Sequence, residues 1–110
     1  FPSTVETFGN ALVEAMSCVA PIVSSNTSAM PEILGDAARF FDPLDVDGMA
    51  DAISDLMGNA RERWALSEKS LAQSKKYSWR QTAAKTADVI KSIAPARTRQ
   101  DQMTKMAPGP

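Results

Sequence analysis

Residues 2–16 of the chain read PSTVETFGNALVEAM, a stretch that combines a helical pattern with two carboxylates separated by seven residues. Its apolar side chains recur at helical spacing, at Phe8, Leu12 and Ala15. This spacing predicts a helix over residues 8–17. Glu6 then lies just ahead of the first turn and Glu14 lies in the second turn.

The start of this predicted helix is a candidate anion site. The first amides of a helix have no partner inside it, and the helix dipole places partial positive charge there. The amides concerned belong to Thr7, Phe8, Gly9 and Asn10. Gly9 has no Cβ, so a ligand can approach the backbone closely. A sugar nucleotide suits this arrangement, because its pyrophosphate accepts from amides while its sugars offer hydroxyls to Glu6 and Glu14.

Further motifs extend the pattern along the chain. They are Pro-Ser at 2–3, Phe-Gly-Asn at 8–10, Glu-Ala-Met at 14–16, Ala-Pro-Ile-Val-Ser-Ser at 20–25 and Pro-Glu-Ile at 31–33. In this combination the sequence resembles the donor-binding half of the retaining GT-B glycosyltransferases of the large group 1 family. Two glutamates separated by seven residues are a hallmark of that family. The resemblance covers Phe1 to about Ile93.

The resemblance implies a role for each matching residue. Glu14 would accept hydroxyls of the nucleotide ribose. Glu6 would contact hydroxyls of the transferred sugar and is the candidate catalytic residue. The amides of residues 7–10 would hold that sugar or the distal phosphate. On the residues alone, Asn26, Thr27 and Ser28, at the carboxyl end of a predicted strand, should face the same side as Glu6. They either line the pocket or cap the helix that follows.

The resemblance also implies the reaction. A hexosyl group would pass from a nucleotide diphosphate sugar to a saccharide or lipid-linked acceptor with retention. The helix dipole and cations would stabilise the departing diphosphate, so neither a cofactor nor a metal is expected. The family usually carries glycine where Val19 stands, so this turn either differs or is strained.

Length and composition agree with one ordinary globular domain of 110 residues, 44% of them apolar. No run approaches the roughly twenty apolar residues of a membrane span, and no secretory signal pattern is present in the chain. The resemblance implies a cytoplasmic enzyme, and a peripheral position at the inner face of the membrane stays open for the parent protein. Cys18 is the only cysteine and histidine is absent, which excludes disulfides and Cys/His metal or nucleophile pairs within the chain. We expect Cys18 to be a small buried residue at a turn.

The charge is distributed unevenly along the chain. Residues 1–60 carry nine acids and one base, Arg39, whereas residues 61–110 carry eleven bases and four acids. The later bases are interleaved with acids on predicted helices, which favours solvated faces over nucleic-acid binding.

Two strands, at residues 21–24 and 38–41, alternate with helices and predict an α/β fold with a parallel, incomplete Rossmann-like sheet. Asp45 should cap a helix with a buried apolar face formed by Met49, Ala52, Ile53, Leu56 and Met57. Further helices are expected at about 60–76 and from Trp79, a predicted packing anchor, to about Ile93.

We therefore expect residues 1–94 to be the C-terminal portion of a nucleotide-sugar-binding domain and residues 95–110 to be a disordered tail. Because two strands are too few for a stable parallel sheet, the chain is expected to be a fragment, inactive without the acceptor domain that relatives carry upstream. Two alternatives stay open. One is a noncatalytic nucleotide-sugar or protein interaction module, and the other is a sugar-nucleotide epimerase on the same fold.

Overall fold

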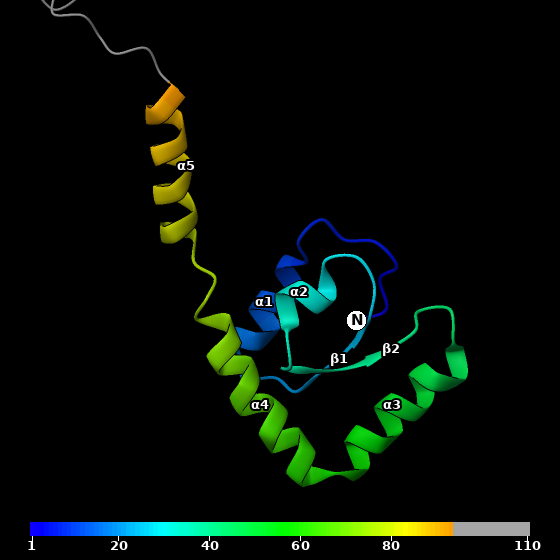
Figure 1. Ribbon diagram of the computed structural model, residues 1–110. Helices are drawn as coiled ribbons and strands as arrows, with labels where there is room; N and C mark the ends of the chain where they lie inside the picture. The colour runs from blue at the N-terminus through cyan, green and yellow to red at the C-terminus, as the bar shows by residue number, and fades with distance from the viewer. Residues whose placement is uncertain (94–110) are drawn as a thin grey trace, which may run out of the picture. The chain divides into compact units, whose positions relative to one another are not determined.

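The computed structural model describes residues 1–93, which form five helices and two strands (Figure 1). In chain order these are α1 (Asn10–Ser17), β1 (Ile22–Ser25), α2 (Met30–Leu34), β2 (Ala38–Phe41), α3 (Val46–Gly58), α4 (Ala60–Ser74) and α5 (Trp79–Ile93). The chain divides into two compact units, Phe1–Ser78 and a second that begins at Trp79. The tail predicted for residues 95–110 lies outside the described residues.

The sheet of the first unit is parallel. β1 pairs with β2 in a register that runs from Ile22 opposite Ala38 to Ser25 opposite Phe41. Phe1 lies along the other side of β1, where its amino group donates to the Val23 carbonyl at 2.8 Å and its own carbonyl accepts from the Ser25 amide at 3.0 Å. β1 therefore has backbone partners on both sides. The predicted α/β class with a small parallel sheet is confirmed.

One apolar core joins α1, β1 and α2. Its buried members are Leu12, Met16, Ile22, Met30, Ile33, Leu34 and Ala37. α4 is fastened to this core by polar side chains, because the buried Gln73 amide donates to the Ile33 carbonyl at 2.9 Å and the Ser70 hydroxyl donates to the Ala37 carbonyl at 3.3 Å. These bonds give carbonyls of buried residues in and after α2 the partners that burial requires.

α3 begins as predicted but is less buried than predicted. The Asp45 side chain accepts from the Gly48 amide at 2.9 Å, which confirms the cap. Ala52 and Leu56 are buried, whereas Ile53 is 44% and Met57 73% exposed, so the prediction of a fully buried five-residue face is wrong. The helix packs mainly through Ala52 and Leu56, which are four positions apart, while Met49 is partly buried.

The second unit contains α5, whose bounds agree with the prediction. It buries none of its side chains, and Trp79 is 80% exposed. The expectation that Trp79 is a packing anchor is therefore wrong for the described residues, since aromatic character alone does not specify a partner. Among residues 1–93, no helix is long and apolar enough to cross a membrane.

The turn after α1 is strained at Val19. The Ala20 amide donates to the Ala15 carbonyl and the Val19 amide to the Met16 carbonyl, which is the Schellman pattern of helix termination. This pattern needs a left-handed residue, and Val19 has φ 61°. The turn thus keeps the geometry that glycine favours and accepts a β-branched side chain in it. Cys18, expected to be buried, is exposed, because it follows the buried Met16 by two positions and falls off that face of the helix.

Replacing Val19 with glycine is expected to raise the free energy of unfolding by about 1 kcal/mol. Removing the strain of a side chain on a left-handed backbone should stabilise the fold by about 1–2 kcal/mol. The greater freedom of glycine in the unfolded chain should offset about 0.5–1 kcal/mol of this gain. Thermal unfolding measures the change. Val19→Ala keeps a Cβ and should gain less; a glycine variant no more stable than the alanine variant would show that the turn carries no strain.

Candidate functional site

The candidate site lies where the loop ahead of α1 meets the loop after β1. α1 begins at Asn10, with Gly9 as its N-cap at φ 81° and ψ 57°. The predicted start at Phe8 is wrong, because Gly9 has a left-handed backbone and cannot belong to a right-handed helix. The amides of Thr7 and Phe8 therefore belong to the loop ahead of the helix, and only Gly9 and Asn10 stand at its start.

The predicted amides have no acceptor within the described part of the chain. None of the hydrogen bonds among residues 1–93 uses the amide of Thr7, Phe8, Gly9 or Asn10 as its donor. The first amide of this region that is bonded belongs to Leu12, which donates to the Gly9 carbonyl at 2.9 Å. These four amides are therefore unsatisfied donors within residues 1–93; Thr7, Phe8 and Asn10 are exposed, whereas Gly9 is buried.

Glu6 is held at both its backbone and its side chain. Its amide donates to the Ser28 hydroxyl oxygen at 3.2 Å, and that hydroxyl donates to the Glu6 carbonyl at 2.7 Å. The Ser3 hydroxyl donates to the Glu6 carboxylate at 2.9 Å. Glu6 is half-buried. One carboxylate oxygen is therefore paired inside the protein, and the group still reaches the surface.

Glu14 lies in the second turn of α1, as predicted, and it is exposed. The buried face of α1 carries Leu12 and Met16, and Glu14 lies midway between them in sequence, on another face of the helix. Its carboxylate is therefore available to a ligand in solvent.

The loop after β1 runs beside the segment that carries Glu6, as predicted for Thr27 and Ser28. The Ser25 hydroxyl donates to the Ser3 carbonyl at 2.5 Å and the Thr27 hydroxyl donates to the Thr4 carbonyl at 3.0 Å. The sequence pattern predicted a polar loop at this position but not these bonds. The polar run Ser25-Asn26-Thr27-Ser28, with three hydroxyl residues, was the available signal, and only the tertiary arrangement identifies the acceptors.

Aromatic packing fixes the side chain of Phe8. Its ring lies 5.6 Å from the Tyr77 ring in an edge-to-face arrangement, with the ring planes at 81°. The Tyr77 hydroxyl donates to the Ile33 carbonyl at 3.2 Å. The segment after α4 thereby braces the loop that carries the unpaired amides.

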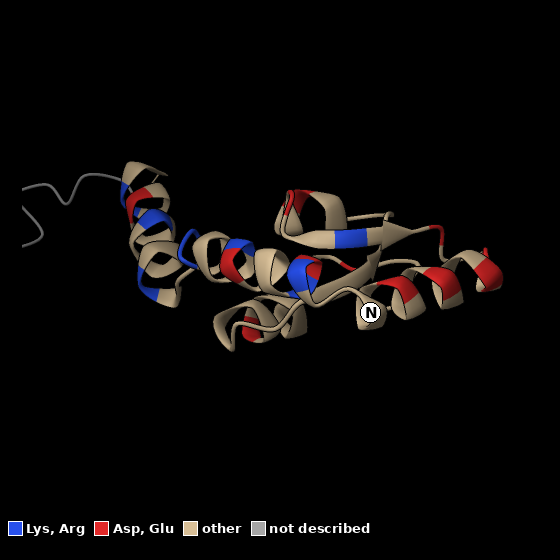
Figure 2. Ribbon diagram, turned by 90° about the horizontal axis from the view of Figure 1, so that it is seen from below, with Lys and Arg blue, Asp and Glu red and all other residues tan. Residues whose placement is uncertain are grey.

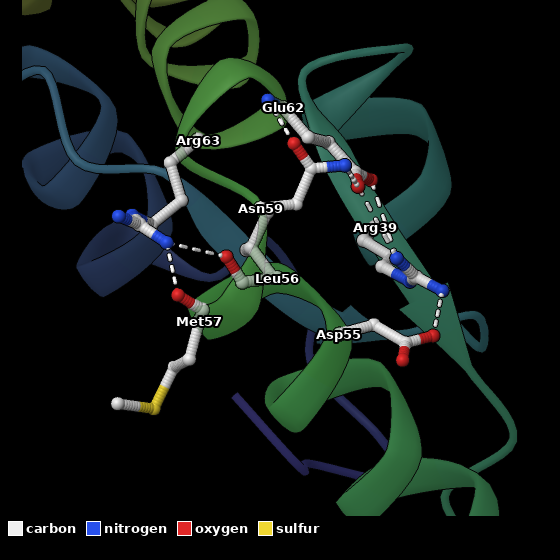
Figure 3. Close-up of polar contacts among 7 residues, drawn as sticks. All are labelled: Arg39, Asp55, Leu56, Met57, Asn59, Glu62 and Arg63. Atoms are coloured by element: carbon white, nitrogen blue, oxygen red, sulfur yellow. Dashed lines mark hydrogen bonds and ion pairs between the residues drawn. The ribbon is translucent and has the colours of Figure 1, made fainter.

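Arg39, the one base in the first sixty residues, is occupied elsewhere. It donates to Asp55 of α3 at 2.7 Å and to Glu62 of α4 at 3.3 Å (Figure 3). Acidic positions recur along α3 (Figure 2). Arg39 therefore balances part of this negative charge and ties β2 to both helices.

The same corner fixes the link between α3 and α4. Asn59 caps α4 by accepting from the Glu62 amide at 3.0 Å, and the Arg63 guanidinium donates to the carbonyls of Leu56 and Met57 at the end of α3 (Figure 3). This corner is structural. Among residues 1–93, no group of three or more His, Cys, Asp or Glu side chains is arranged to hold a metal ion.

Comparison with known proteins adds a family to this geometry. The family model described as glycosyl transferases group 1 matches residues 1–59. O-antigen chain mannosyltransferase B of Escherichia coli is 37% identical over 93 residues, which cover 84% of this chain and 24% of that protein. MMP alpha-(1->4)-mannosyltransferase of Mycolicibacterium hassiacum is 36% identical over 98 residues, which cover 84% of this chain and 24% of that protein.

A eukaryotic relative shares the same region. The phosphatidylinositol N-acetylglucosaminyltransferase gpi3 subunit of Schizosaccharomyces pombe is 32% identical over 93 residues, which are 84% of this chain and 20% of that protein. The chain thus spans a quarter or less of the length of these relatives.

Proposed function

The chain belongs to the group 1 glycosyltransferases, and we propose that it forms part of the donor-binding half of such an enzyme. The parent enzyme transfers a hexosyl group from a nucleotide diphosphate sugar to an acceptor, with retention of the anomeric configuration. The observation that carries this proposal is the placement of Glu6 directly ahead of four amides that have no partner among residues 1–93, with Glu14 in the helix that follows.

The proposed contacts follow from the chemistry of the donor. The amides of residues 7–10 and the dipole of α1 bind the distal phosphate or the transferred sugar. Glu6 and Glu14 accept hydrogen bonds from vicinal hydroxyls, Glu6 from the transferred sugar and Glu14 from the ribose. Glu6 is the proposed catalytic residue, because its carboxylate lies beside the sugar that reacts.

The departing diphosphate needs its negative charge to be stabilised. When the bond to the sugar breaks, negative charge grows on the diphosphate, and prearranged donors stabilise that charge without reorganisation. The unpaired amides provide such donors. We propose that cations from the preceding part of the parent enzyme complete this stabilisation, because Arg39 is already paired with Asp55 and Glu62.

Two of the relatives described above are named mannosyltransferases and a third is named an N-acetylglucosaminyltransferase. Mannose linked to a nucleoside diphosphate is therefore the first donor to test. The acceptor is proposed to be a saccharide or a lipid-linked glycan, bound by the acceptor domain upstream of this chain. The family assignment favours a transferase over the epimerase alternative.

Replacing Glu14 with alanine in the intact parent enzyme is expected to weaken donor binding at least ten-fold. The change removes one or two hydrogen bonds to a carboxylate, each worth about 1.5–3 kcal/mol. Calorimetric titration with GDP- and UDP-linked hexoses measures the affinity.

Glu68→Ala is the matched control, because Glu68 is also an exposed helical glutamate but lies on α4. Its donor affinity should equal that of the unmodified enzyme. An unchanged affinity for a folded Glu14→Ala variant would contradict the assignment of Glu14.

A further inference from the structure

Three hydroxyls, one at the end of β1 and two in the loop that follows, fasten the segment that carries Glu6. Ser25, Thr27 and Ser28 donate to the carbonyls of Ser3, Thr4 and Glu6, respectively. The donors and acceptors lie 22 or 23 positions apart in sequence, so the bonds are tertiary contacts rather than features of a local turn. We call these three residues the hydroxyl clamp.

Ser28 is the member of the hydroxyl clamp that holds Glu6 itself. Its hydroxyl accepts from the Glu6 amide and donates to the Glu6 carbonyl, so one oxygen atom engages both polar groups of the residue. Two bonds to the main chain restrict both the position and the rotation of this residue. The direction in which the Glu6 side chain leaves the backbone is fixed as a result.

The backbone of Ser28 also favours a positioning role. Its φ is 54°, in the left-handed region that glycine adopts without strain and other residues rarely occupy. Glycine could therefore form this turn more easily than serine, but it could not hold Glu6. Strain of this kind is characteristic of residues at functional sites.

We propose that Ser28 is a positioning residue that acts on the sugar donor through Glu6. This inference rests on the proposed function, because it assumes that Glu6 contacts the transferred sugar. Ser28 itself makes no contact with the donor. With its hydroxyl removed, Glu6 keeps its carboxylate but samples more orientations, and the donor has to restrict them on binding.

Two substitutions at this position separate the hydroxyl from the backbone. In the intact parent enzyme, Ser28→Gly removes both bonds and relieves the left-handed strain. We expect roughly three- to ten-fold weaker binding of GDP-mannose, as for one or two neutral hydrogen bonds, with a melting temperature that does not fall in proportion. Ser28→Thr keeps the hydroxyl but adds a β-branch at φ 54°, so it should lower the melting temperature and retain most of the affinity. If Ser28 served only the fold, the affinity for GDP-mannose would fall in each variant only as far as the melting temperature falls.

A double-mutant cycle tests whether Ser28 acts through Glu6. In a Glu6→Ala background, Ser28→Gly should cause no further loss of GDP-mannose affinity, because the carboxylate that it positions is gone. Additive losses, or a Ser28→Gly variant that binds as tightly as the unmodified enzyme, would overturn the inference. If the glycine variant does not fold, Ser28→Asn replaces it in the cycle, since asparagine tolerates the left-handed backbone. An unchanged affinity for Glu6→Ala alone would instead contradict the proposed function.

Discussion

A valine at position 9 is expected to lower the free energy of unfolding by about 2–5 kcal/mol. Gly9 adopts φ 81°, where a side chain costs about 1–2 kcal/mol, and a β-branched one is a marked outlier. A Cβ built there would lie 3.2 Å from Cδ1 of Leu12, which is 2% exposed and belongs to the core. Forcing bulk against a packed core side chain costs about 1–3 kcal/mol more.

The structure thereby changes the expectation for this glycine. From sequence alone, Gly9 is a place where a donor approaches the backbone. With the left-handed φ and the contact to Leu12, the fold also depends on Gly9. The Gly9→Val variant should therefore lose both stability and donor binding.

Thermal unfolding of the intact parent enzyme measures the loss, and amide exchange over residues 10–17 locates it at α1. Gly58→Ala is the matched control, because no atom lies within 4 Å of a Cβ added to this last residue of α3. Alanine there should be neutral or stabilising by up to about 1 kcal/mol. A Gly9→Val variant as stable as Gly58→Ala would contradict the account of Gly9.

The isolated 110-residue chain is expected to show no glycosyl transfer and to bind sugar nucleotides no more tightly than about millimolar. Millimolar affinity already requires about 4 kcal/mol. The start of α1 offers about 0.3–1 kcal/mol per anion when exposed and about 2 kcal/mol when partly buried. Arg39 cannot offset the repulsion between the glutamates and a diphosphate while it is paired with Asp55 and Glu62.

Titration of the isolated chain with GDP- and UDP-linked hexoses, followed through its amide resonances, tests this expectation. The intact parent enzyme, titrated under the same conditions, is the positive control and should bind far more tightly. Micromolar binding by the isolated chain would show that the residues of this chain suffice for the donor. The proposal that upstream cations complete the site would then be withdrawn.

Local patterns predicted the elements better than they predicted burial. β2 and the cap at Asp45 are confirmed, because a short apolar strand ended by Asp42-Pro43 and an acidic cap are encoded in adjacent residues. Burial depends on what packs against a helix, and sequence periodicity does not reveal that. The same 3.6-residue pattern therefore includes the buried Leu56 and the exposed Met57.

In the candidate site, too, some features could be predicted from local sequence and others could not. The positions of Glu6 ahead of the helix and of Glu14 in its second turn could be predicted, because both follow from counting along one helix. The left-handed Gly9 moved the helix start by two residues, and no hydrophobic pattern indicates a φ value. The bonds from Ser28 to Glu6 join two loops that are 22 residues apart, so they depend on how β1 lies beside the first residues of the chain.

The hydroxyl clamp binds only main-chain atoms of the segment that it holds. These bonds therefore do not depend on the side chains of Thr4 and Val5, both of which are exposed next to Glu6. Mutations at these two positions can accumulate without shifting the path of the loop, because the acceptors are present in every amino acid. The segment is thus evolvable, and a library randomised at positions 4 and 5 would vary the surface beside a fixed Glu6 in search of altered donor preference.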